Sequence, residues 1–181
     1  MRAADNSARN LFARLKSLAV EDRSRRIENF CTESLAFLLL NSDEFQRRFL
    51  RLIGHTGRGT GFLFNTQEFC RAKTGGSHEG EKNYFDLVAV SDLSRRVYII
   101  EVKASTGFPD DQLPKYRAAA ARSYQGFSIR LISLSPHAEG PIGSDLHRTW
   151  NDVAKQISKI PGPAPISWLW RNSPTSSRTK V

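Results

Sequence analysis

The sequence predicts an α/β fold with a mixed central sheet flanked by helices. Two short apolar runs, residues 84–90 and 97–104, are separated by a short polar linker, which is typical of two antiparallel strands joined by a turn. An alanine-rich helical segment and then a strand rich in β-branched residues and leucine follow, which favours a crossover to a buried parallel strand. Helical segments precede and follow this unit.

The N-terminal part of the chain is expected to be helical. Its pattern of apolar residues predicts helices over residues 7–18, 23–40 and 42–53, the last of which is rich in basic residues. A glycine-rich break separates them from a strand expected over residues 62–69. Residues 73–81 contain a pair of glycines and are expected to form a loop that leads into the two central strands.

After the two central strands, a helix is expected over residues 111–124, a strand over 127–134 and an amphipathic helix over 145–159. A stretch rich in proline then ends the regular structure, and the last residues are rich in serine, threonine and basic residues. We therefore expect a single domain over residues 1–160. Residues 161–181 are expected to be a Pro-rich linker and a basic, disordered tail.

Charged residues interrupt the two apolar central strands. Asp86 is the charged residue of the first strand, and Glu101 and Lys103 lie in the second. The two-residue period of a strand places Glu101 and Lys103 on one face, and a hairpin brings Asp86 toward Glu101. Two converging carboxylates repel each other unless a cation lies between them, and ligation by oxygen atoms alone is what magnesium prefers.

A second polar pair follows in the expected helix. Gln112 and Tyr116 are four residues apart, so they lie on one face of that helix. One interpretation is structural, with Tyr116 as a core aromatic residue and Gln112 in solvent. The other, favoured by the position of the pair directly after the charged hairpin, is that both belong to a site with Asp86, Glu101 and Lys103.

The pattern Asp86-x14-Glu101-x-Lys103, followed by Gln112-x3-Tyr116, resembles the PD-(D/E)XK nuclease superfamily and its RecB-type branch. Phe85 stands where the family name has proline. The resemblance implies a restriction-endonuclease-like αβββαβ core, and residues 1–160 would then be one nuclease-like domain with an N-terminal helical segment.

The resemblance also implies roles for these residues. Asp86, Glu101 and the backbone carbonyl of Val102 would hold Mg²⁺, for which Mn²⁺ would substitute. Lys103 would orient the attacking water or stabilise the transition state. Gln112 and Tyr116 would position the nucleic-acid strand or the groups around the metal.

Glu33 is a further candidate metal ligand. It lies on a helical stripe with Phe30, Phe37 and Leu40, so it is expected to point inward, whereas Glu28 is expected in solvent. The segment 28–33 resembles the N-terminal helix of many members of the superfamily, in which a glutamate helps to hold the metal or its water. The alternative is a buried salt bridge between Glu33 and an arginine.

Composition favours a nucleic-acid partner. The chain has 27 Lys and Arg against 18 Asp and Glu, a formal net charge of +9 and a pI near 10.0. No run is apolar enough for a membrane span or a signal peptide, so a cytoplasmic location is expected. Candidate phosphate contacts are Arg47, Arg48, Arg51, Arg58, Arg71, Lys73, Lys115, Arg117 and Arg122.

Other chemistries find little support. The four histidines lack zinc-ligand spacing, and two cysteines cannot hold the iron–sulfur cluster of some RecB-type nucleases. Residues 57–61 are rich in glycine but lack the Gly-Lys-Ser/Thr ending of a P-loop. Trp150 is expected to be a core residue rather than a platform for bases.

The function expected from the sequence is metal-dependent hydrolysis of phosphodiester bonds, in DNA rather than RNA. Endonuclease and exonuclease activity both stay open, as do roles in restriction, defence, repair or recombination, and so does a homodimer or a partner protein that supplies specificity. One alternative is a catalytically inactive nucleic-acid-binding or assembly module on the same fold. Another treats Glu101 and Lys103 as surface pairs on an exposed strand.

Overall fold

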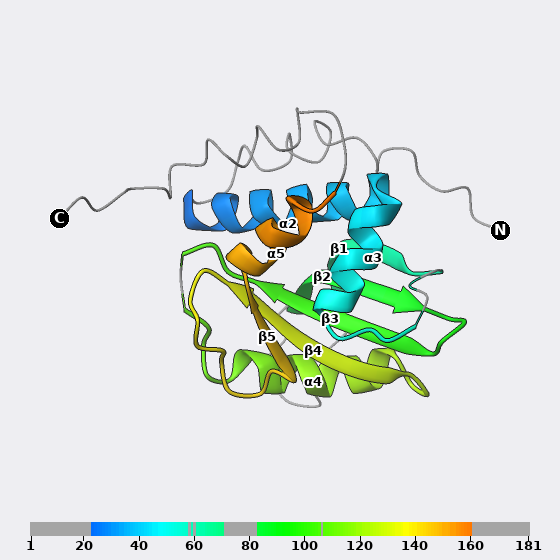
Figure 1. Ribbon diagram of the computed structural model, residues 1–181. Helices are drawn as coiled ribbons and strands as arrows, with labels where there is room; N and C mark the ends of the chain where they lie inside the picture. The colour runs from blue at the N-terminus through cyan, green and yellow to red at the C-terminus, as the bar shows by residue number, and fades with distance from the viewer. Residues whose placement is uncertain (1–22, 58, 60, 71–82, 106, 161–181) are drawn as a thin grey trace.

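The computed structural model describes residues 23–57, 59, 61–70, 83–105 and 107–160. In this part of the chain a five-stranded mixed sheet is covered by helices on both faces. The helices α2, Arg23–Asn41, α3, Asp43–Leu52, and α5, Trp150–Ile157, lie on one face, and α4, Gln112–Ser123, lies on the other (Figure 1). The expected α/β fold is therefore confirmed.

The strands follow one another across the sheet in sequence order. They are β1, Leu63–Cys70, β2, Asn83–Ser91, β3, Arg96–Val102, β4, Ser128–Ser135, and β5, Leu146–Thr149. The first three are antiparallel, and β4 and β5 add in parallel. Both the expected hairpin and the expected parallel position of the later strand are confirmed.

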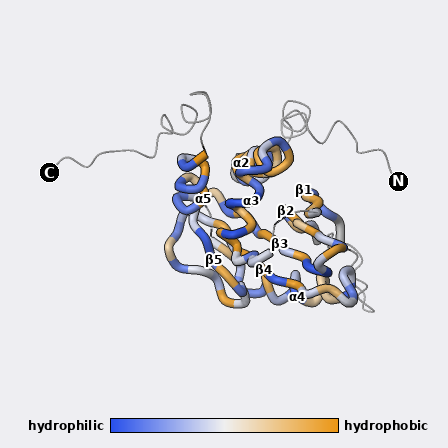
Figure 2. The backbone as a smooth tube through the Cα atoms, turned by 45° about the vertical axis from the view of Figure 1, so that its right-hand side comes forward, coloured by the Kyte–Doolittle hydropathy of each residue, from blue (hydrophilic) through white to orange (hydrophobic). Residues whose placement is uncertain are grey.

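Two apolar cores lie on the two faces of the sheet, and Figure 2 shows these layers from a second direction, with α2 above the sheet and α4 below it. The strand β3 contributes alternately to both. Val97 and Ile99 pack toward α4, whereas Tyr98, Ile100 and Val102 pack toward α2, α3 and α5. This confirms the alternation expected from the sequence, and it places Glu101 on the side of α4.

The alternation breaks in β2 at Asp86. Phe85 packs in the core beside α4, but Leu87, two residues later, packs in the opposite core. The pairing of β1 with β2 skips the position that Gln67 and Asp86 would share, and Gln67 has a φ of 51°. A local irregularity of this kind re-aims a side chain. At this irregularity the Asp86 carboxylate accepts a hydrogen bond from the backbone N–H of Val102 in β3.

The expected helix over residues 145–159 is wrong in its first part, because residues 146–149 form β5 beside β4. The side chain of Thr149 accepts a hydrogen bond from the backbone N–H of Asp152, and the Asp152 carboxylate accepts one from the Thr149 N–H. This capping box marks the N-terminus of the helix, so α5 begins at Trp150.

The expected elements over residues 7–18 and 73–81, and the expected tail over 161–181, lie outside the described residues. None of the helices in the described ranges combines the length and the apolar character that crossing a membrane requires.

Candidate active site

The hairpin brings Asp86 and Glu101 together at one end of the sheet. Oδ2 of Asp86 accepts a hydrogen bond of 2.9 Å from the backbone N–H of Val102, the residue after Glu101. Glu101 is 1 % exposed, and Asp86 is partly exposed. The interpretation of Glu101 as a member of a surface pair is therefore wrong, because this carboxylate lies in the interior.

Negative charges on Asp86 and Glu101 at the same time would repel each other in this buried position. Burial raises the pKa of the Asp86 carboxyl well above its usual range, and the negative charge of Glu101 raises it further. The Val102 N–H and the Lys103 ammonium act in the opposite direction without cancelling the shift. Either a proton on Asp86 or a cation between the two groups relieves the repulsion.

The two oxygens of Glu101 differ in their surroundings. Oε1 accepts a hydrogen bond of 2.6 Å from Nε2 of Gln112 and lies 2.7 Å from Nζ of Lys103. Oε2 is buried and has no hydrogen-bond donor among the described residues. Because an unsatisfied buried carboxylate oxygen is costly, Oε2 fits the role of a ligand to a cation.

Lys103 lies between two carboxylates. Its Nζ is 2.7 Å from Oε1 of Glu101 and 3.5 Å from Oε2 of Glu28, and its side chain is 12 % exposed. Burial opposes the charged form, but the negative charges of Glu101 and then Asp86 outweigh this effect and raise the pKa of the Lys103 ammonium. Lys103 is therefore held as a charged donor beside the carboxylate pair.

The backbone of Lys103 is fixed on both sides. Its N–H donates to the carbonyl of Leu134 at 2.8 Å, and its carbonyl accepts a hydrogen bond of 2.8 Å from the indole Nε1 of Trp150. Trp150 also packs against the larger core, as expected for a core residue. This support holds the end of β3 in place, and with it the side chains of Glu101 and of Lys103, which directly follows β3.

Gln112 and Tyr116 both reach the site from α4, as their spacing predicts. Nε2 of Gln112 donates to Glu101 and lies 3.3 Å from the hydroxyl of Tyr116, which in turn donates to the carbonyl of Tyr84 at 2.7 Å. The ring of Tyr116 packs edge-on against Phe85. Tyr116 is thus both a core aromatic residue and part of the polar network, so the two interpretations of this residue are compatible.

Within the same network, the Tyr116 hydroxyl stays protonated and one oxygen of Gln112 has no hydrogen-bond partner among the described residues. Burial, and then the charges of Glu101 and Asp86, raise the pKa of the Tyr116 hydroxyl, so it stays protonated and acts as a donor. Oε1 of Gln112 is buried and has no hydrogen-bond partner among the described residues. Together with Oε2 of Glu101 it gives two open acceptor oxygens, which suits a cation that carries water.

One of the two glutamates of α2, Glu28, is more buried than the sequence predicted. Glu28, expected in solvent, has a side chain that is only 17 % exposed, and it contacts Lys103. Glu28 is buried because α2 packs against the end of β3. The sequence around Glu28 does not predict this packing. Glu33 is buried, with 7 % exposure, as expected. The stripe from which this was expected is not the buried face of α2, however, because Phe30 is 51 % exposed, whereas Leu35, Ala36 and Leu39 are buried.

A metal role for Glu33 stays a prediction. Within the described ranges, no three His, Cys, Asp or Glu side chains form a group suited to hold a metal ion. Magnesium, however, is commonly bound by one or two carboxylates together with water and other oxygens. Asp86, Glu101 and the Val102 carbonyl fit that pattern without a third carboxylate.

A row of polar residues missed by the sequence analysis continues across the sheet from Glu101. Glu101 pairs in register with Ser133 of β4, and Ser133 pairs with His147 of β5. Oγ of Ser133 lies 2.8 Å from Nδ1 of His147, and Nε2 of His147 lies 2.8 Å from the carbonyl of His137. Because a carbonyl only accepts, we assign the proton of a neutral His147 to Nε2, so Ser133 donates to Nδ1.

Several candidate phosphate contacts form ion pairs within the protein. Arg47 and Arg48 contact Glu44, Lys115 contacts Asp111, and Arg117 contacts Asp145. Arg51 and Arg122 are exposed. The remaining candidates, Arg58, Arg71 and Lys73, lie outside the described residues.

The arrangement joins two carboxylates, one charged lysine and two side chains that hold the buried carboxylate in place. These groups come from β2, from β3 and the residue directly after it, and from α4. No protein-family model, no curated protein and no solved structure matches this chain.

Proposed function

We propose that this chain is a metal-dependent nuclease that hydrolyses phosphodiester bonds, with DNA as its substrate, on a restriction-endonuclease-like αβββαβ core. The observation that carries the proposal is the buried Oε2 of Glu101, which lacks a donor among the described residues beside the ammonium of Lys103 and the carboxyl group of Asp86. The order α2, β1, β2, β3, α4, β4 supports the proposed core.

Asp86, Glu101 and the backbone carbonyl of Val102 would hold Mg²⁺, and Mn²⁺ would substitute. When bound, the metal lowers the pKa of a coordinated water and offsets charge on the scissile phosphate. Gln112 holds the Glu101 carboxylate through Oε1, which leaves Oε2 for the metal. Tyr116 anchors Gln112 to the backbone of Tyr84, so α4 fixes the direction of the ligand.

Lys103 supplies the positive charge of the site. Its ammonium would donate to the attacking water or to a non-bridging phosphate oxygen, where negative charge grows in the transition state. Without a substrate, the Lys103 ammonium forms ion pairs with Glu28 and Glu101. A phosphate that approaches would compete with Glu28, whose contact with Lys103 is the longer of the two.

We test this proposal by cleavage of circular duplex, linear duplex and single-stranded DNA, and of RNA, in magnesium, manganese or chelator. Cleavage should require the metal, and Lys103→Ala should lower the rate about a hundred- to a thousand-fold with most binding retained, since it removes a transition-state contact. Lys159→Ala is a matched control, because Lys159 is exposed after α5. Equal rates for Lys103→Ala and the parent would show that the assigned role is wrong.

One observation favours a second candidate, a non-catalytic nucleic-acid-binding module. The Lys103 ammonium is already paired with Glu101 and Glu28, so the cluster could serve as a structural salt-bridge network. Such a module would bind nucleic acid equally in magnesium and in chelator and would cleave none of the four substrates.

A further inference from the structure

A cleft of about 580 Å³ opens beyond the C-terminal ends of β3 and β4. In α/β sheets, ligands bind preferentially at this edge, and the volume is in the range of pockets that enclose small organic groups. The described residues that form its walls belong to the segments 107–110 and 135–142, and they include Phe108, Asp110, Ser135, His137, Glu139 and Pro141.

The two segments that line the cleft are continuous in the chain with residues of the candidate active site. Phe108 and Asp110 lie between Lys103 and Gln112 in the sequence. Ser135 directly follows Leu134, whose carbonyl accepts the hydrogen bond from the backbone of Lys103. A nucleotide bound at Lys103 through its phosphate could therefore place its neighbouring part in the cleft.

The chemistry of the walls differs from that of the protein as a whole. The chain carries a formal net charge of +9, yet the described wall residues include no lysine or arginine and do include two carboxylates, Asp110 and Glu139. Phe108 and Pro141 add apolar surface. These walls repel phosphate, and they suit a flat, uncharged group that donates hydrogen bonds.

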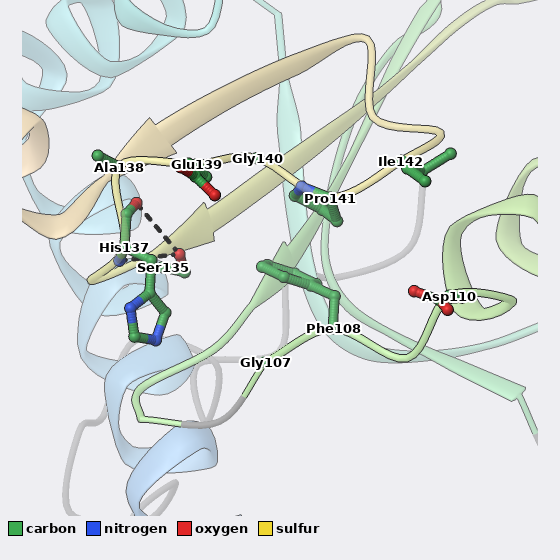
Figure 3. Close-up of a pocket in the computed structure, with 10 residues that line it drawn as sticks. All are labelled: Gly107, Phe108, Asp110, Ser135, His137, Ala138, Glu139, Gly140, Pro141 and Ile142. Atoms are coloured by element: carbon green, nitrogen blue, oxygen red, sulfur yellow. Dashed lines mark hydrogen bonds between the residues drawn. The ribbon is translucent and has the colours of Figure 1, made fainter.

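One wall is held rigid by internal hydrogen bonds. The N–H of His137 donates to Oγ of Ser135 at 3.2 Å, and the carbonyl of His137 accepts from His147 at 2.8 Å. Figure 3 shows the ring of Phe108 between this turn and Asp110, with Pro141 across from it. Because both backbone groups of His137 are already bonded, the side chains of the walls are the main candidates for recognition.

We infer that this cleft binds one unpaired nucleobase that carries an exocyclic amino group. The base stacks on Phe108, and its amino group donates to Asp110 or Glu139, as carboxylates do with cytosine. Adenine, cytosine and guanine have such a group, whereas the one donor of thymine at this edge, its ring N3–H, lies between two carbonyl oxygens that the carboxylates repel. This inference rests on the proposed function. A base in a duplex must leave its stack and its partner to enter the cleft, so we also expect a preference for unpaired substrate.

We test the inference by fluorescence anisotropy with labelled homopolymers of deoxycytidine, deoxyadenosine and deoxythymidine of equal length, in chelator to prevent cleavage. The deoxycytidine and deoxyadenosine strands should bind about tenfold more tightly than deoxythymidine. Phe108→Ala should weaken their binding about tenfold, within the range that loss of one base–aromatic stack produces, and Phe108→Trp should retain it. Asp110→Asn with Glu139→Gln should bring the three affinities together.

The control variant is Leu93→Ala, because Leu93 is 86 % exposed in the turn between β2 and β3, at the other end of β3. It should bind all three strands as the parent does. Equal affinities for the three strands, or unchanged binding by Phe108→Ala, would overturn the inference even if the protein cleaves DNA. Conversely, a base preference that depends on Phe108 in a protein without cleavage would reject the proposed nuclease and leave the cleft as a base-binding site.

Discussion

At the scale of single residues, Glu101 and Asp86 determine the chemistry of the site. Glu101 is 1 % exposed and directs one oxygen to two donors, while its other oxygen has no donor among the described residues. Burial and the charge of Glu101 raise the pKa of Asp86. Under the proposed function, a proton and a metal ion would compete for Asp86.

This competition predicts a pH dependence that changes with metal concentration. The raised pKa keeps the proton on Asp86 to a higher pH than for an ordinary aspartate, so magnesium affinity should fall as the pH falls through that range. We expect the acid limb of the cleavage rate to move to lower pH when magnesium is increased. Rates measured across pH at a low and a high magnesium concentration test this, and coincident profiles would contradict it.

Some features of these single residues could be predicted from the sequence and others could not. The positions of Glu101 and Lys103 on one face follow from the period of a strand, so they were predictable. The contact of Glu28 with Lys103, and the orientation of Asp86 opposite Gln67, depend on segments distant in the sequence. No local pattern contains that information.

At the scale of elements, α4 positions the buried carboxylate. Gln112 reaches Glu101 only because α4 covers this face of the sheet, where Tyr116 packs on Phe85. The spacing of Gln112 and Tyr116 predicted a shared helix face, and the structure confirms it. The spacing could not show that Gln112 holds one oxygen of Glu101 and leaves the other open.

Gln112→Ala should therefore act through Glu101 rather than on the substrate. We expect magnesium affinity and cleavage rate to fall about 10- to 100-fold, as is typical when a group that orients a metal ligand is lost. Gln125→Ala, exposed in the turn after α4, is the matched control. If Gln112→Ala lowers DNA affinity but leaves magnesium affinity unchanged, the role assigned to Gln112 is wrong.

The capping box at the start of α5 makes a prediction for stability. Thr149→Ala removes the side chain that accepts from the N–H of Asp152, which should lower the free energy of unfolding by about 1 kcal/mol. Thr56→Ala, at an exposed position, should leave it nearly unchanged. Urea denaturation measures both. A stability loss equal in the two variants would argue against the capping role.

The start of α5 was also where the sequence analysis of the elements failed. Residues 146–149 fitted a helical pattern, but they are too few to show a clear strand period, and the neighbouring β4 draws them into the sheet. Thr149 and Asp152 did contain a usable signal, since this spacing is typical of a helix start.

At the scale of the whole molecule, the candidate active site and the cleft share one edge of the sheet. Asp86, Glu101 and Lys103 lie near the C-terminal end of β3, and the cleft opens beyond β3 and β4. The order of helices and strands from α2 to β4 was predictable from the apolar runs and their lengths, whereas β5 was not. The cleft was not, because it is formed by two loops that only the completed sheet brings together.

Magnesium binding tests the central claim most directly. Isothermal titration of the metal-free protein should show saturable magnesium binding that Asp86→Asn abolishes, since this change removes a ligand charge and keeps an acceptor for the Val102 N–H. Manganese should give the same pattern. If the parent binds neither metal, or if Asp86→Asn binds both as tightly as the parent, the two carboxylates do not form a metal centre.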